Sequence, residues 1–405
     1  MNVVFLSPNY PLEMHEYTRG LAEVGARVYG VGDTPVHGLA PKVREALTDY
    51  LQVPGIMDES SVEERVRAWV KGKTIDRLET NWEPLVLLAA KLRDRLGIPG
   101  LSHDAAIGFR DKQVMKERLA RAGLRVPHSQ RVRSSSEALA AAERVGFPLI
   151  LKPISGAGSA DTYRCNDADE LRQALSRMQH VSEASCEEFV EGEEFTYDTV
   201  CIEGRAAYEN VCQYLPRPLV ARTNEWISPI ICTVRDLSEP RLRDGIALGR
   251  KVLQALGMRS GFTHMEWYKK ENGEVVFGEI GCRPGGAHLV DQMNYTGDID
   301  LFREWARAVC HHSFDAPTER KYNAAIVFKR AMGRGRITRI EGLEEWKRRC
   351  GKWVASEQLL PVGAERRNWL QTLVSDGFVI VRHPEWDEAI RMAEDAAVNI
   401  RMYAQ

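Results

Sequence analysis

Hydrophobic positions in the first hundred residues alternate between short strand-like runs and longer helix-like runs. The strand-like runs are NVVFLSP, ARVYGVGD and IDRLETN, and the helix-like runs between and after them are EYTRGLAEVG, SVEERVRAWVKG and PLVLLAAKLRDRLG. Such alternation is typical of a parallel α/β unit. We therefore expect a Rossmann-like domain over residues 1–104. No GxGxxG follows the first strand, so a dinucleotide site is not expected there.

From residue 105 the pattern changes to helices, loops and antiparallel strands. The helical run FRDKQVMKERLARAG ends at Gly123, and Ser134 with Glu137 predicts a capping box at the start of SEALAAAERV. After about residue 320 the runs AAIVFKR, GRITRI, FVIVRHP and DEAIRMAEDAAVNIRM predict a separate small α/β domain. The expected fold class is thus α/β and α+β multidomain, with boundaries at 1–104, 105–319 and 320–405.

The segment GFTHMEWYKKENGEVVFGEIGCRPGG predicts a β-hairpin. Asn272 and Gly273 lie between two strand-like runs, and Asn-Gly favours a two-residue turn. In that register Glu271 pairs with Glu274. Steps of two residues along each strand then place Glu266 opposite Glu279 on one face of the hairpin.

Two glutamates that face each other repel unless a cation or a shared proton offsets their charge. Mg²⁺ takes oxygen ligands and is typically held by one or two carboxylates together with substrate phosphates. Arg283 and a Pro-Gly-Gly loop follow directly and offer a guanidinium for phosphate or carboxylate. The conjunction favours a magnesium site at Glu266 and Glu279 over two glutamates on a solvated sheet face.

Two further segments each leave two interpretations open. Lys152 ends the apolar strand LILKP before ISGAGSADT, which resembles a phosphate cradle, although a mobile surface loop explains its glycines equally well. Downstream, CEEFVEGEEF fits an exposed acidic edge strand. It also fits a strand whose backbone hydrogen-bonds an adenine edge while a glutamate accepts from a ribose.

The amino-acid composition limits the classes of partner that the protein can bind, but it does not indicate which reaction it catalyses. The chain has 55 Lys and Arg against 57 Asp and Glu, a net charge of −2, which disfavours nucleic acid or a membrane surface as a partner. The basic run Lys347 to Lys352 fits a solvated helix face. No signal peptide or membrane-spanning run is expected. Eight cysteines without a CxxC pair favour reduced thiols in a cytoplasmic protein over a zinc site or a cysteine nucleophile.

The charged residues and the loop follow one another in a definite order: Lys112, Lys152 with its Gly/Ser loop, Glu187 to Glu194, Glu266, Glu279 and Arg283. This order resembles the ATP-grasp superfamily over about residues 105–310. Because an α/β unit precedes this part and a small domain follows it, the chain is similar to carboxylate-amine ligases such as L-amino acid ligases over nearly its whole length. The resemblance implies an ATP-grasp domain with a mobile lid at about 125–190, a preceding Rossmann-like domain and a C-terminal α/β cap.

The resemblance also implies a role for each residue. Lys112 and Lys152 would contact the phosphates of ATP, and the phosphate loop of the lid would comprise Ser155, Gly156, Gly158, Ser159 and Ala160. Glu187 and the backbone of Glu188 and Val190 would hold the adenine edge, and Glu194 the ribose. Glu266 and Glu279 would bind Mg²⁺ or Mn²⁺. The catalytic group would be Arg283, Lys152 and His288, with His264 and Glu225 as further candidates to assist the amine.

One position departs from the family pattern. Many members carry an asparagine two residues after the second glutamate as a further metal ligand, and Gly281 occupies that place here. Whether one or two metal ions bind therefore stays open. Arg217 and Arg222, in LPRPLVARTNEWISPI, are alternatives for pairing with a substrate carboxylate. A homodimer is also consistent with the resemblance.

The implied activity is that of an ATP-dependent ligase. It would activate a small-molecule carboxylate as an acyl phosphate and join it to an amine, releasing ADP and phosphate. The alternatives are a phosphotransferase or thioester-forming ligase on the same fold, or a nucleotide-binding protein without turnover.

Overall fold

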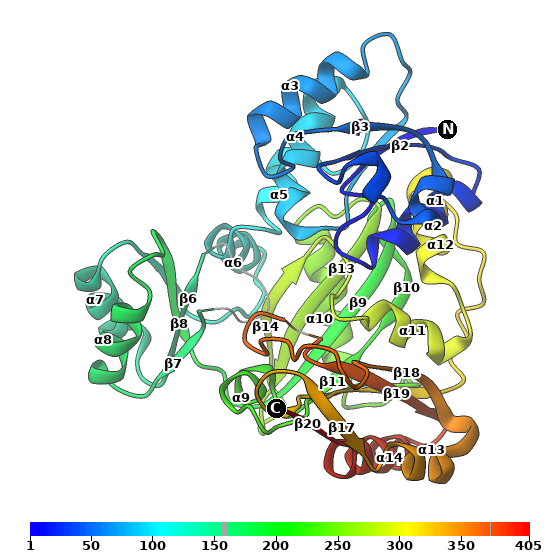
Figure 1. Cartoon of the computed structure of the whole chain (residues 1–405). Helices are drawn as coiled ribbons and strands as arrows, with labels where there is room; N and C mark the ends of the chain where they lie inside the picture. Colours follow the sequence, from blue (N-terminus) through cyan, green and yellow to red (C-terminus); the bar gives the residue numbers. More distant parts are fainter. Residues whose placement is uncertain (155–160, 373) are drawn as a thin grey trace.

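Three lobes meet around a large central sheet in the computed structural model of the chain, which describes residues 1–154, 161–372 and 374–405. The N-terminal lobe lies at the top of Figure 1, a small lobe built from β5 to β8 projects to the left, and the C-terminal elements lie at the bottom. The predicted mixed α/β class is confirmed.

The N-terminal lobe contains a sheet of four parallel strands in the order β3-β2-β1-β4. This arrangement confirms the Rossmann-like layout. The lobe packs through aromatic rings on the central sheet and on α12, since the Tyr17 ring lies 6.0 Å from Phe262 on β13 and 5.2 Å from Trp305 on α12. Its elements are β1 (Asn2–Leu6), α1 (Met14–Glu23), β2 (Arg27–Gly32), η1 (Val36–Gly38), α2 (Pro41–Ala46), β3 (Leu47–Gln52), α3 (Glu59–Trp69), β4 (Arg77–Glu79), η2 (Glu83–Leu85), α4 (Val86–Leu96) and α5 (His103–Ile107).

The small lobe, which we call the lid, is an antiparallel sheet in the order β5-β8-β6-β7 with two helices packed on it. Ser134 caps α7 by accepting from the backbone N–H of Glu137, and Glu137 accepts in return from the N–H of Arg133, so the predicted capping interaction is present. The core of the lid is built from its own residues, Val132 to Cys186. The elements are β5 (Ser129–Val132), α7 (Ser135–Val145), β6 (Leu149–Pro153), β7 (Tyr163–Cys165), α8 (Ala168–Arg177) and β8 (Ala184–Glu188).

The central sheet has nine strands in the order β14-β13-β9-β11-β12-β15-β19-β18, with β10 paired to β9. The residues up to 319 contribute α6 (Lys112–Arg121), β9 (Glu193–Ile202), β10 (Arg205–Asn210), β11 (Cys212–Leu215), α9 (Pro218–Thr223), β12 (Ile230–Thr233), α10 (Arg243–Ala255), β13 (Gly261–Lys269), β14 (Val275–Gly281), α11 (Leu289–Gly297) and α12 (Leu301–His311). The glutamates of interest lie on β13 and β14, at one edge of this sheet.

The C-terminal segment extends the same sheet. β15 pairs with β12 along its length, and β19 and β18 follow outward, while α14 packs against β12, β15 and β19. The boundary predicted at 319–320 therefore falls within a continuous sheet. The elements are β15 (Asn323–Phe328), β16 (Met332–Gly333), β17 (Ile337–Glu341), α13 (Leu343–Cys350), η3 (Gly351–Trp353), β18 (Val354–Leu359), β19 (Gly377–His383), α14 (Trp386–Asn399) and β20 (Arg401–Ala404).

The β13–β14 hairpin differs from its predicted form at the turn. The backbone N–H of Lys270 donates to Glu274 O, and that of Gly273 donates to Lys270 O, so Lys270 pairs with Glu274 across a three-residue turn and the predicted pairing of Glu271 with Glu274 is wrong. A register shift after Glu266 inserts Gly278 as an extra residue on β14. A Cβ at Gly278 would lie 2.8 Å from Glu266 O, so the bulge requires glycine.

Across all described ranges of the chain, no helix combines the length and apolar character needed to cross a membrane. All eight cysteines are free thiols, and seven of them are buried, as the sequence predicts.

Candidate active site

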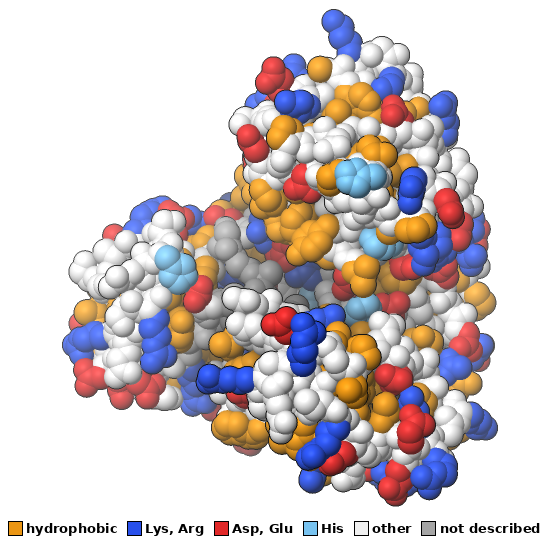
Figure 2. Space-filling model, in the orientation of Figure 1, with side chains coloured by type: hydrophobic (Ala, Val, Ile, Leu, Met, Phe, Trp, Pro, Cys, Tyr) orange, Lys and Arg blue, Asp and Glu red, His pale blue; other side chains and the backbone are white. Residues whose placement is uncertain are grey.

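A cleft of about 620 Å³ opens where the three lobes meet. Figure 2 shows the corresponding hollow between the lobes. Every part of the chain contributes to its lining, including Tyr10, Glu13 and Trp82 from the N-terminal lobe, Lys152 and Glu187 to Val190 from the lid, Glu266 and Glu279 from the central sheet, and Arg330 from the C-terminal segment. Apart from Glu225, the sequence-predicted site residues that the structure describes therefore lie around a single cavity.

Glu266 and Glu279 are paired directly across the hairpin, as predicted. The Gly278 bulge offsets the displaced turn by one residue and so restores this pairing. Because residues directly opposite on antiparallel strands project to the same face, both carboxylates point toward the cleft that they line.

Lysines surround Glu279. Lys112 lies in the first turn of α6, after the N-cap Asp111, and its Nζ is 2.9 Å from Glu279 Oε1. Lys152 Nζ lies 3.7 Å from Glu279 Oε2 and 2.6 Å from Glu187 Oε1. Helix α6 and strand β6 thus bring both predicted phosphate-binding lysines to one carboxylate.

Lys116 completes this group and was missed in the sequence. Its Nζ forms an ion pair with Glu187 Oε2, and both side chains are buried. Lys116 follows Lys112 by four residues, so the two lie on the same face of α6, and this spacing was the available signal. Burial, followed by repulsion from Lys152, holds the pKa of Lys116 well below its usual value.

The two paired glutamates have opposite electrostatic environments. Burial alone would raise the pKa of Glu279, but Lys112 and Lys152 hold it at about 2. The pKa of Glu266 is raised, mainly by burial and further by the charge of Glu279, against an opposing effect of His264. Glu279 is therefore a stable anion, whereas at Glu266 burial outweighs the nearby positive charges.

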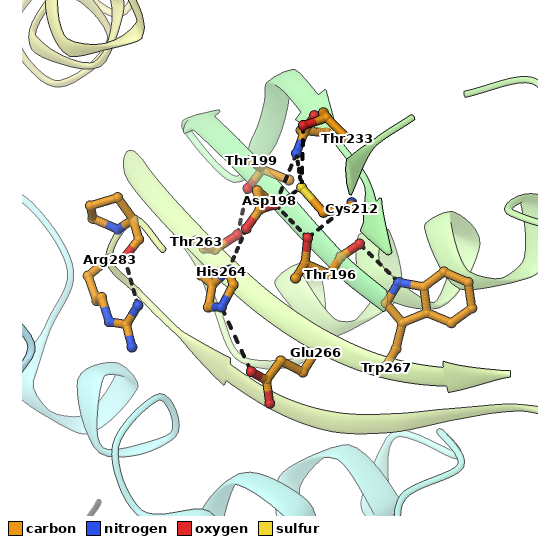
Figure 3. A network of polar contacts seen from close by, with 12 residues as sticks. Thr196, Asp198, Thr199, Cys212, Thr233, Thr263, His264, Glu266, Trp267 and Arg283 are labelled. Carbon is orange, nitrogen blue, oxygen red and sulfur yellow. Dashed lines mark hydrogen bonds and ion pairs between the residues drawn. The ribbon is translucent and has the colours of Figure 1, made fainter. Parts of the chain in front are cut away.

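Figure 3 shows the polar network behind Glu266. Asp198, which is 1% exposed, lies with Oδ1 2.5 Å from Nδ1 of His264, and the Nε2 atom of the same ring lies 3.9 Å from Glu266 Oε1. Thr196 Oγ1 and Asn210 Nδ2 donate to the other oxygen of Asp198 at 2.7 and 3.1 Å. The buried carboxylate thus fixes the His264 ring beside Glu266.

Arg283 lies just beyond β14 and is anchored to the N-terminal lobe. Its Nε and Nη2 donate to Glu83 Oε2 at 2.7 and 2.5 Å, and Nη1 donates to the carbonyl oxygen of Pro284 at 2.7 Å. Arg110 pairs with the other oxygen of Glu83. The guanidinium is thereby held at the edge of the cleft.

The segment from Glu187 to Glu194 connects the lid to β9 along one side of the cleft. Glu188 is engaged by Arg125 Nη2 at 2.7 Å, and its backbone N–H donates to His128 O. Glu194 accepts from Arg217 Nε at 3.0 Å. Burial, followed by the charge of Glu266, raises the pKa of Glu194 to about 7.

The remaining predicted residues have different positions. His288 lines the cleft with Nδ1 2.8 Å from Asp291 Oδ2; burial opposes protonation, but Asp291 raises the pKa of the ring overall. Glu225 is exposed and pairs with Arg366 instead. Ser155, Gly156, Gly158, Ser159 and Ala160 lie outside the described residues. A Cβ at Gly281 would meet the Arg283 side chain at 3.6 Å, an ordinary contact.

The donor set at the hairpin fits magnesium. Within residues 1–154, 161–372 and 374–405 no group of three or more His, Cys, Asp or Glu side chains is arranged to hold a metal ion by itself. Glu266 and Glu279 nevertheless present two hard carboxylates to an open cleft. Mg²⁺ is typically bound by this minimal set when substrate phosphates and water supply the other ligands.

Comparison with known sequences identifies the central part of the chain. A family described as ATP-grasp domain matches residues 145–291. An L-arginine-specific L-amino acid ligase from Bacillus subtilis is 24% identical over 283 residues, which are 68% of each chain. An alanine–anticapsin ligase from Bacillus subtilis (strain 168) is 26% identical over 259 residues, 58% of this chain and 54% of that protein. The chain thus spans about two thirds of the first relative's length and about half of the second's.

Solved structures share the fold over the full length. An L-amino acid ligase from Bacillus licheniformis superimposes with a TM-score of 0.79 at 21% identity, covering 100% of this chain and 98% of that one. An N5-carboxyaminoimidazole ribonucleotide synthetase from Thermotoga maritima gives 0.73 at 19% identity, with 100% and 99% covered. Residues 145–291 thus match the ATP-grasp domain family, and the chain as a whole shares the fold of these solved structures.

Proposed function

We propose that the protein is an ATP-dependent carboxylate-amine ligase that acts on amino acids or similar small molecules. The observation that carries the proposal is the pair of opposed glutamates, Glu266 and Glu279, with Lys112 and Lys152 beside them in the cleft. The relatives named as L-amino acid ligases support the choice of substrates. ATP-grasp ligases in general use ATP with a divalent metal ion.

Glu266 and Glu279 would hold Mg²⁺, or Mn²⁺ in its place. The metal ion would supply positive charge that offsets the anionic phosphates in the phosphoryl-transfer transition state. The raised pKa of Glu266 supports this role, since the positive charges near it do not offset its burial and the charge of Glu279.

Lys112, Lys152 and Arg283 would bind the phosphates. Glu279 and Glu187 form ion pairs with the two lysines, and Glu83 forms one with Arg283. Entry of ATP would exchange these carboxylate partners for phosphate oxygens. Arg283 would stabilise the γ-phosphoryl group as a carboxylate oxygen of the substrate attacks the phosphorus and ADP departs.

The lid and the segment that follows it would enclose the nucleotide. Glu187 and the backbone of Glu188 and Val190 would contact the adenine edge, and Glu194 the ribose. Because the lid has a hydrophobic core of its own, it can move as a unit over the cleft, and closure would exclude water that hydrolyses an acyl phosphate.

The second half-reaction joins the acyl group to the amine. The amine nitrogen attacks the carbonyl carbon of the acyl phosphate, inorganic phosphate leaves, and the nitrogen loses a proton. His288, which Asp291 orients in the cleft, is the proposed proton acceptor. We also propose that the enzyme is cytoplasmic and forms a homodimer, which light scattering of the purified protein would test.

A substrate screen tests the activity. Purified protein is incubated with ATP, MgCl₂ and pairs of amino acids, and released phosphate is measured. We expect phosphate release that requires both a carboxylate and an amine, together with a product of amide mass. A stable phosphorylated product would instead indicate a phosphotransferase, and a thioester would indicate a thioester-forming ligase. If ATP binds but no pair of substrates is turned over, the proposed activity is refuted.

A further inference from the structure

Two arginines on the C-terminal wall of the cleft have no role in the mechanism proposed above. Arg222 lies in the last turn of α9, Arg330 is the second residue after β15, and both line the cleft. Nη1 of Arg330 donates to the carbonyl oxygens of Ala221 and Asn224, each at 2.8 Å. Since Ala221 adjoins Arg222, these bonds hold the two guanidinium groups on the same wall.

The partners of these two arginines are electrically neutral. Arg222 Nη2 donates to Leu370 O at 2.9 Å, and the Arg330 guanidinium lies 4.6 Å from the centre of the Trp369 ring. Across the parts of the chain that the structure describes, neither side chain forms an ion pair. Arg217, by contrast, is paired with Glu194 at 3.0 Å, so of the two arginines considered in the sequence only Arg222 has a charge without a counterion among the described residues.

Nearby carboxylates offset this charge only in part, since burial outweighs the attraction of Glu225 and Asp376 for Arg330. Glu225 pairs with Arg366, and Asp376 Oδ2 lies 3.6 Å from Nε of the same arginine. Burial lowers the pKa of Arg222, and burial followed by repulsion from Arg222 lowers the pKa of Arg330 to about 10. Partly buried cations without counterions are costly, and an anion bound between them would relieve that cost.

We propose that Arg222 and Arg330 bind the carboxylate that the amine substrate keeps throughout the reaction, so that this substrate is an amino acid rather than a simple amine. The inference rests on the proposed function and deepens it. The carboxylate of the other substrate is consumed and belongs beside Glu266, Glu279 and Arg283, so a second carboxylate needs a separate site. Arginine forks suit carboxylates because they donate two parallel hydrogen bonds.

The charge of the wall also discriminates between acceptors. A simple amine arrives largely as a cation, which the two guanidinium groups repel. An amino acid brings a carboxylate that pairs with them and leaves its nitrogen directed toward the rest of the cleft. A preference for acceptors with a free carboxylate follows.

Acceptor kinetics test the proposal. L-alanine, L-leucine and L-phenylalanine are each compared with their α-carboxamides as acceptors, using wild type, Arg222→Ala, Arg222→Lys and Arg330→Lys. Hydroxylamine, a nucleophile without a carboxylate, reports activation of the other substrate. Arg391→Gln, an exposed site on α14, is the remote charge control.

We expect wild type to show a kcat/KM at least tenfold higher for the amino acids than for the carboxamides. Arg222→Ala should abolish that preference while keeping the KM for ATP and the rate with hydroxylamine, and the lysine variants should retain part of it. Equal use of carboxamides by wild type, or an unchanged preference in Arg222→Ala, overturns the proposal. A raised KM for ATP, or a lost hydroxylamine reaction, also overturns it by assigning the arginines to the nucleotide or to the activated substrate.

Binding of the same three amino acids, measured by calorimetry with a non-hydrolysable ATP analogue and MgCl₂, separates this inference from the proposed function. Arg222-dependent binding without any turnover would support the carboxylate site and refute the ligase activity. Turnover that does not depend on Arg222 would support the ligase activity and refute the carboxylate site. An absence of amino acid binding by wild type also counts against the site.

Discussion

The two sides of the β13–β14 hairpin differ sharply although each contributes one glutamate to the same cleft. On the β14 side, Glu279 faces lysines from α6 and the lid, and its pKa is held at about 2. On the β13 side, Glu266 lies near His264, Tyr214 and the carboxylate of Glu194, and its pKa is raised. The sheet pairing sets the positions of the two carboxylates, and the surrounding elements set their charge. A divalent cation would supply the further positive charge that offsets the burial of Glu266.

The largest expected effect comes from Glu279→Gln, which removes the anion on the lysine side. The variant should lose turnover on the order of a thousandfold, because the metal site loses a ligand and Lys112 loses its counterion. Phosphate release with saturating substrates measures this. Glu271→Gln, at the exposed turn of the same hairpin, should behave as wild type. Unchanged ATP consumption by Glu279→Gln would contradict the assignment.

Lys116→Met tests whether the lysine side is a tight electrostatic unit. The change leaves buried Glu187 with Lys152 as its remaining lysine partner, so the free energy of unfolding should fall by about 3 kcal/mol. Urea unfolding monitored by circular dichroism provides the measurement. Lys347→Met, in a partly exposed ion pair with Glu357 at the surface, should change stability by under about 1 kcal/mol. An equally small loss for Lys116→Met would show that this ion pair contributes little.

Asp198→Asn tests the β13 side of the hairpin, where Glu266 lies. The amide keeps the shape of the side chain but alters the hydrogen bond that orients His264, and through it the position of Glu266. Losing such an orienting partner typically costs about 10–100-fold in metal affinity or activity. The concentration of Mn²⁺ that gives half-maximal turnover should rise accordingly, whereas Asp236→Asn, an exposed loop site, should leave it unchanged. An unaltered metal dependence in Asp198→Asn would assign the network to stability alone.

Glu194→Gln should give the smallest effect, and it depends on pH. The folded protein holds the Glu194 proton up to a pKa of about 7, above the usual value of 4.5, so the unfolded chain releases it first as pH rises. The ionised side chain therefore destabilises wild type progressively between those values and fully above them. At pH 8 the variant should be more stable by about 1 kcal/mol, since a full pKa unit corresponds to ~1.4 kcal/mol and Arg217 loses an ionic partner. At pH 5 the two proteins should melt together; a constant difference at both pH values would argue against titration of Glu194.

The hairpin shows how far local sequence determines this site. Asn272 and Gly273 mark the turn correctly, but the turn has one residue more than the Asn-Gly pattern predicts. Gly278 then adds a residue to β14, and the two deviations cancel at Glu266 and Glu279. The sequence reports glycine positions but not which glycine forms a bulge, because a bulge depends on the backbone of the partner strand.

Longer-range features were less accessible from the sequence. The spacing of Lys112 and Lys116 was visible, yet the burial of Lys116 against Glu187 depends on how α6 packs beside the lid. The pairing of β12 with β15 joins residues about ninety positions apart, and local hydrophobic patterns do not specify such partners. The contribution of Arg330 to the cleft follows from that pairing and could not be anticipated before it.

The pairing of β12 with β15 also constrains how the protein is made. Until β15 and then β19 emerge from the ribosome, β12 presents an open sheet edge. Its four residues, Ile230 to Thr233, are all buried in the complete fold. Such an edge invites pairing with other chains. A nascent chain that already contains both glutamates and the lysines is thus exposed to misassembly until the last fifth of the protein, from β15 onward, has been synthesised.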